Sequence, residues 1–77
     1  MKVITLKGLY HRNKECIGIY FKQDIILNDI VKRIVKAKWS KTAICWYLPC
    51  TKEYYELIVK TCGGEAHLQT AQLKYYL

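Results

Sequence analysis

The spacing of apolar residues changes along the chain, and this change limits it to folds that combine strands with helices. Apolar and polar side chains alternate in residues 2–10 and 16–21, as in the Ile-Thr-Leu-Lys segment at 4–7. A period of two is typical of a strand with one buried face. Because only the polar residues 11–15 separate the two runs, we expect a β-hairpin joined by about five residues.

A helical period follows the hairpin. The apolar positions of the next segment recur three and four residues apart, at Leu27, Ile30, Val31 and Ile34. Asp24 is a suitable N-cap, because its carboxylate can accept a hydrogen bond from a free amide of the first turn. The pattern predicts a helix over residues 25–36.

A second amphipathic segment occupies residues 52–62 and follows Thr51, another suitable N-cap. The residues that it would bury are Tyr55, Ile58, Val59 and Cys62. Gly63 and Gly64 come directly after it and predict a left-handed C-cap. Beyond them we expect a short strand at residues 66–68 and a helical turn capped by Thr70.

Residues 39–50, WSKTAICWYLPC, contain both tryptophans and the only proline. We predict a turn over residues 39–42 and a strand over 43–48 that Pro49 ends, since proline cannot donate to a sheet. Alternation would direct Ile44, Trp46 and Leu48 into the core, with Trp46 as its anchor, and Tyr47 toward the opposite face. Gly18, inside the second run, indicates a bulge or a close approach to the backbone.

These elements predict one small α+β domain over residues 1–77, with two layers. We expect a mainly antiparallel sheet of three or four strands, in the order ββαβα with an optional last strand. Both helices would cover one sheet face, because each has a single apolar stripe to bury. The other face would remain open to solvent or to a partner.

Composition excludes several functional classes. The four cysteines, Cys16, Cys45, Cys50 and Cys62, lack the spacing of a zinc site, and we expect buried free thiols rather than ligands or disulfides. No apolar run approaches the ~18 residues of a membrane span, and no signal-peptide pattern begins the chain. We therefore expect a cytoplasmic chain with no metal, no cofactor, no membrane contact and no small-molecule substrate.

Thirteen Lys and Arg residues against six Asp and Glu leave a net charge of +7, and polyanions are common partners of such a surface. A basic surface that only keeps the protein in solution is the alternative. If the open face binds duplex DNA, its candidate contacts come from that face and from the neighbouring loops. They are Lys7, Arg12, Lys14, Tyr20, Lys38, Lys41 and Tyr47.

Four stretches together resemble the N-terminal region of bacterial tyrosine-type site-specific recombinases, the integrases of phages and other mobile elements. They are ITLKGLYHRNKECIGIYF, LNDIVKRIV, AKWSKTAICWYLPCTKEYYELI and AHLQTAQLK. The resemblance covers nearly the whole chain, and the spacing of the Trp, Cys, Tyr and Pro residues in the third stretch is its most specific part. A fainter likeness exists to the HARP domain of annealing helicases.

The resemblance implies an arm-type DNA-binding domain that holds accessory DNA sites during integration and recombination. It also implies core-binding and catalytic domains elsewhere in a longer integrase. Strand exchange in that family needs a tyrosine nucleophile with arginines, a histidine and a lysine. This chain has only two arginines, and Tyr75 and Tyr76 lack the other groups, so we expect no catalytic residue here. The alternative function is a protein–protein interaction module that assembles recombinase subunits, with Tyr20 and Tyr47 as anchors.

Overall fold

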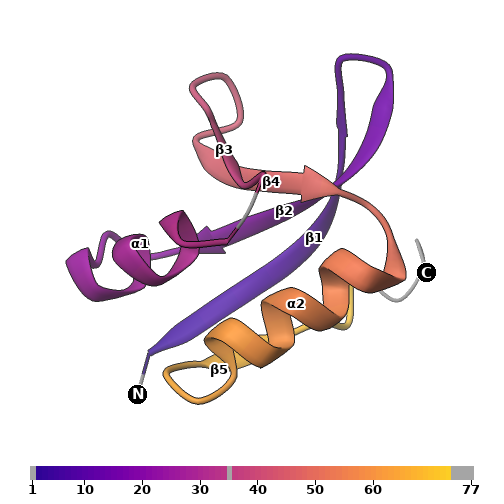
Figure 1. Ribbon diagram of the computed structural model, residues 1–77. Coiled ribbons are helices and arrows are strands. Elements are labelled where there is room, and N and C mark those ends of the chain that lie inside the picture. Colours follow the sequence, from indigo (N-terminus) through magenta and orange to yellow (C-terminus); the bar gives the residue numbers. More distant parts are fainter. Residues whose placement is uncertain (1, 35, 74–77) are drawn as a thin grey trace.

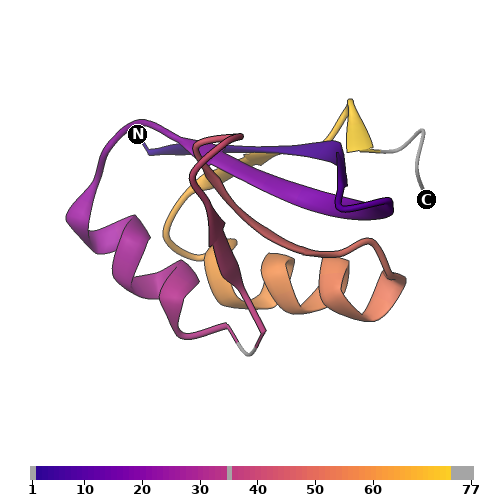
Figure 2. The same ribbon diagram turned by 90° about the horizontal axis from the view of Figure 1, so that it is seen from above.

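The computed structural model describes residues 2–34 and 36–73, and it has the two-layer α+β architecture (Figure 1). Its elements are β1 (Val3–His11), β2 (Lys14–Phe21), α1 (Ile25–Lys32), β3 (Lys38–Ser40), β4 (Cys45–Pro49), α2 (Lys52–Cys62) and β5 (His67–Gln69). The strands form one sheet in the order β3-β4-β2-β1-β5, in which only the β1–β5 pair is parallel. Figure 2 shows both helices on the same side of this sheet. The sheet is therefore wider than the three or four strands expected, and it is mixed.

The β1–β2 hairpin turns more tightly than the polar segment suggested. Arg12 and Asn13 alone connect the strands, with φ angles of 51° and 64°. Two successive left-handed residues are typical of the type I′ turn, whose twist matches that of the flanking strands. The expected loop of five residues is therefore wrong, and His11 and Lys14 belong to the sheet.

Helix α1 begins as expected and ends early. The Asp24 carboxylate accepts a hydrogen bond from the Leu27 amide at 3.0 Å and also forms an ion pair with Lys2 at 2.8 Å. The helix ends at Lys32, with Arg33 as its C-cap. The predicted end at residue 36 is therefore wrong, because the described residues 33, 34 and 36 are not helical. Lys36 has a φ of 71°, which turns the chain toward β3.

The segment between the helices contains an additional strand. Lys38–Ser40 pairs with β4 at the edge of the sheet, where a turn was expected. The turn comes later and closes with a 2.8 Å hydrogen bond from the Ile44 amide to the Ser40 carbonyl oxygen. Ile44 was expected in the core, but it is 72% exposed and has a φ of 56°. Strand β4 consequently begins at Cys45.

Helix α2 has the predicted bounds, and its N-cap Thr51 accepts a 3.2 Å hydrogen bond from the Tyr54 amide. Of its expected buried residues, Ile58 and Cys62 are fully buried and Tyr55 is half-buried, whereas Val59 is exposed. The expected left-handed cap is wrong, because Gly63 has a φ of −62° and no described glycine has a positive one. A turn of ordinary backbone leads to β5 instead.

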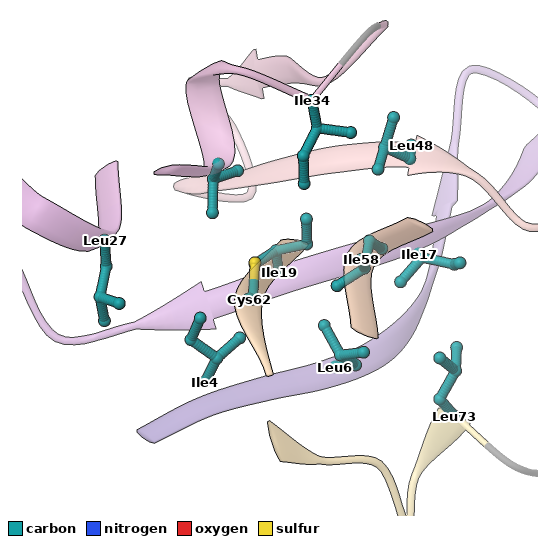
Figure 3. Packing of buried hydrophobic residues seen from close by; sticks show 11 residues of the cluster. Ile4, Leu6, Ile17, Ile19, Leu27, Ile34, Leu48, Ile58, Cys62 and Leu73 are labelled. Atoms are coloured by element: carbon teal, nitrogen blue, oxygen red, sulfur yellow. The ribbon is translucent and has the colours of Figure 1, made fainter. Parts of the chain in front are cut away.

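The core fills the space between the sheet and the two helices (Figure 3). Its fully or nearly fully buried members are Ile4, Leu6, Ile17, Ile19, Leu27, Val31, Ile34, Leu48, Ile58, Cys62 and Leu73. Leu73 reaches the core from a turn in which its amide bonds the Thr70 carbonyl oxygen at 3.0 Å, as the expected helical turn requires. Tyr75 and Tyr76 lie outside the described residues.

The two tryptophans pack at the margin of the core. Trp46 is half-buried, and its indole N–H donates to the Asn28 Oδ1 atom at 2.9 Å. The Trp39 ring meets the Trp46 ring edge-on, with 5.6 Å between centroids. Trp46 therefore joins β4 to α1, while Trp39, 46% exposed, covers it from outside.

Candidate nucleic-acid interface

The register of the sheet aligns a row of residues across four strands. Lys38 of β3 pairs with Tyr47 of β4, Tyr47 with Gly18 of β2, and Gly18 with Lys7 of β1. Side chains alternate between the two sides of a strand, and the intervening residues of β1 and β2 are buried under the helices. The row therefore lies on the face that the helices leave uncovered (Figure 2). We call this side of the sheet the open face.

A flat aromatic ring occupies the centre of the open face. A Cβ atom at Gly18 would lie only 2.7 Å from Tyr20 Cε2, so the ring rests directly over the glycine. The Lys7 ammonium stands 5.1 Å from the centroid of the same ring, within the range of a cation–π interaction. The pairing of β2 runs unbroken through Gly18, so a bulge is wrong and a close approach is confirmed.

The Tyr20 hydroxyl group is fixed by a neighbour on β4. It donates a hydrogen bond to the Cys45 thiol, which is buried on the same side of the sheet. Partial burial, followed by this hydrogen bond, raises the pKa of Tyr20 to about 12. Tyr20 is therefore neutral at physiological pH, and its ring is held at both ends.

A cationic hollow adjoins the open face at the turn of the hairpin. Its volume is about 480 Å³. Its lining residues are His11, Arg12, Lys14, Cys16, Lys36, Lys38, Tyr47 and Pro49. The lining includes one arginine, three lysines and no carboxylate, so it favours an anion. We call this set of residues the tip hollow.

An aromatic pair forms one wall of the tip hollow. The His11 and Tyr47 rings lie 4.5 Å apart between centroids, inclined by 44°. Tyr47 also belongs to the row across the sheet, so the tip hollow and the open face are continuous.

A second hollow, of about 580 Å³, lies at the other end of the same strands and includes Lys2, Lys22 and Asp24. Its charge differs from that of the tip hollow, because Lys2 is paired with Asp24. The open face is thus most positive near the hairpin turn.

The structure brings most of the candidate residues together. Arg12, Lys14, Lys38 and Tyr47 line the tip hollow, and Lys7 and Tyr20 form the centre of the open face. Lys41 lies in the turn between β3 and β4 and lines neither.

Sequence reasoning missed four residues of the tip hollow, which are His11, Cys16, Lys36 and Pro49. No clear signal for His11 was present, because the alternation of polar and apolar residues in β1 is interrupted at Leu9. Lys36 carried no signal either, since its position depends on a left-handed backbone between α1 and β3.

The four cysteines have free thiols. Burial raises the pKa of each thiol, which disfavours the thiolate that a metal requires. Across residues 2–34 and 36–73 there is no group of three or more His, Cys, Asp or Glu side chains that could hold a metal ion. Within the same residues, no helix has the length and apolar character to span a membrane.

Comparison with known proteins adds no relative. No family model, no curated protein and no solved structure matches this chain. The fold and the candidate site thus define a small α+β domain with one sheet face that is open, aromatic and cationic. Functional inference depends on the chemistry of that face.

Proposed function

We propose that this chain is a DNA-binding domain that contacts duplex DNA through the open face and the tip hollow. The observation that carries the proposal is the row of Lys38, Tyr47, Gly18 and Lys7 on the uncovered side of the sheet. The net charge of +7 supports it, because neutralising phosphates and releasing their counterions supplies much of the affinity for DNA.

The dimensions of the sheet limit how it can meet the major groove. Strands are spaced about 4.8 Å apart, so the four strands that contain the row span roughly 14 Å. The major groove is about 12 Å wide and admits a two-stranded ribbon, so β1 and β2 would face the base edges while the outer strands lie against the flanking phosphates. Gly18 and the flat Tyr20 ring keep the middle of this surface low, which favours close approach of base edges.

The resemblance to tyrosine recombinases suggests the biological setting. In that setting the domain holds accessory sites on the DNA of a phage or another mobile element, in the bacterial cytoplasm, while other domains of the integrase catalyse strand exchange. This chain contributes binding rather than catalysis.

Fluorescence anisotropy with a labelled duplex tests the proposal. If the surface neutralises about four phosphates, raising the salt from 50 to 200 mM lowers affinity roughly 100-fold. We expect Lys7→Ala to weaken binding and to reduce the salt slope by about 1. Lys60→Ala is the matched control, because Lys60 is exposed on α2 in the helical layer. Absence of binding at 50 mM salt, or equal losses in both variants, would refute the proposal.

A specific observation favours the second candidate function, association with another recombinase subunit. Ile25, Trp39 and Ile44 are exposed by 82%, 46% and 72% around a hollow of about 600 Å³ between α1 and the β3–β4 turn. Apolar exposure of this kind is typical of protein interfaces. Sedimentation equilibrium without DNA would detect self-association, and Ile44→Asn should abolish it. A monomer at every concentration would exclude a homotypic interface.

A further inference from the structure

We propose that the tip hollow is a phosphate-binding site that holds two successive phosphate groups of one nucleic-acid strand. This inference deepens the proposed DNA-binding function and rests on it. The open face would contact the bases, and the tip hollow would fix the position of the domain along the DNA backbone.

Cations converge on the tip hollow from separate parts of the chain. Arg12 comes from the hairpin turn, Lys14 from β2, Lys36 from the connection after α1, and Lys38 from β3. Arg12 and Lys36 both have left-handed backbones, with φ angles of 51° and 71°. The fold therefore holds two of the four cations in a backbone conformation that is unfavourable for residues with a side chain.

Nothing within the lining neutralises these cations. No aspartate or glutamate lines the tip hollow, whereas at the opposite end of the strands Asp24 pairs with Lys2. Four like charges in one concave surface repel one another, and a multivalent anion removes that repulsion. Two neighbouring phosphates match this requirement better than a single monoanion.

The size of the tip hollow also favours two phosphate groups. Its volume of about 480 Å³ corresponds to roughly 16 water molecules in the liquid. A phosphate ion has five non-hydrogen atoms and pyrophosphate has nine, so the hollow admits the larger group together with bound water. The Tyr47 hydroxyl and the His11 ring add hydrogen-bonding groups to the wall that they form.

Two-dimensional NMR of the whole chain with inorganic pyrophosphate tests the site directly. At 50 mM salt we expect shifts concentrated at His11, Arg12, Lys38 and Tyr47, with no comparable shifts at Lys22. Equal shifts at both ends of the strands would overturn the proposal.

Two turn variants supply a matched comparison. Arg12→Asn removes one positive charge and retains a residue that tolerates the left-handed backbone, and Lys41→Asn removes one charge from the turn outside the hollow. We expect Arg12→Asn to weaken binding of both pyrophosphate and duplex DNA at least fivefold, and Lys41→Asn to weaken each less than twofold. Equal effects would exclude a dedicated site.

The outcomes separate this inference from the proposed function. If duplex DNA binds but pyrophosphate does not bind the tip hollow, the inference fails and the DNA-binding function stands. If pyrophosphate binds there but DNA does not bind at all, the hollow takes free diphosphates, and both the proposed function and the backbone role are wrong.

Discussion

Replacing Gly18 with alanine tests whether the open face is built around the Tyr20 ring. The new Cβ atom would lie 2.7 Å from Tyr20 Cε2 and 3.2 Å from Cζ and the hydroxyl oxygen. Carbon atoms do not approach so closely, and the ring is the part that can move. We therefore expect the ring to swing away from β2 and to lose its contacts with Lys7 and Cys45.

The magnitude follows from those contacts. An exposed cation–π pair contributes about 0.5–1 kcal/mol, and a hydrogen bond contributes about 0.5–1.5 kcal/mol. Against this loss, alanine stabilises a strand interior by about 0.5–1 kcal/mol relative to glycine. The expected net effect of Gly18→Ala is a destabilisation of about 1 kcal/mol, or roughly 4–8 °C in Tm for a domain of this size.

A double-mutant cycle measured by urea denaturation isolates the cause. In a Tyr20→Thr background no ring is present, so Gly18→Ala should stabilise the domain by about 0.5–1 kcal/mol through the strand preference alone. The sign of the effect thus reverses between the two backgrounds. If Gly18→Ala destabilises both equally, the obstacle at Gly18 is not the Tyr20 ring and our description of the open face is wrong.

Two further predictions concern backbone strain and pH. Ile44→Gly should raise the free energy of unfolding by about 0.5–1 kcal/mol, because a left-handed backbone is unfavourable for a residue with a side chain by about 1–2 kcal/mol and Ile44 is mostly exposed. Ile25→Asn, a change at another exposed position, should alter the free energy of unfolding by less than about 0.5 kcal/mol. A loss of stability in Ile44→Gly would contradict the argument. Since the pKa of Tyr20 is about 12 in the folded chain and about 10 when unfolded, its contribution to stability is complete below pH 10 and is lost as the pH rises through 12. Urea titrations across that range should show a decline that is smaller in Tyr20→Phe, and equal declines would contradict it.

Much of the fold could be predicted because the local signals agree with the tertiary structure. Asp24 and Thr51 cap the two helices as their side chains predict, and α2 has the predicted bounds. The alternation in β1 also correctly predicted Lys7 on the open face. A strand with one buried face must direct its apolar residues into the core, so its polar residues point to the other side.

The errors concern residues whose conformation depends on distant partners. Lys38–Ser40 is too short and too polar to indicate a strand, and it becomes one only by pairing with β4. Ile44 was expected inside because alternation was extended through it, whereas the preceding turn holds it in a left-handed conformation.

The tip hollow could not be predicted for the same reason. It requires both the tight hairpin turn at Arg12 and the reversal of the chain at Lys36. Neither backbone conformation is apparent from the side chains alone. Composition indicated a cationic surface, but the place where the cations gather follows from the tertiary structure.

The parallel pairing of β5 with β1 governs when the domain can finish folding during its synthesis. Val3 lies beside His67, so β1 waits for a partner that is made 64 positions later. Until then the outer margin of β1 has unpaired amide and carbonyl groups, which another nascent chain can engage. Shortening the chain before His67 would make that transient exposure permanent, and aggregation of such a fragment is its direct consequence.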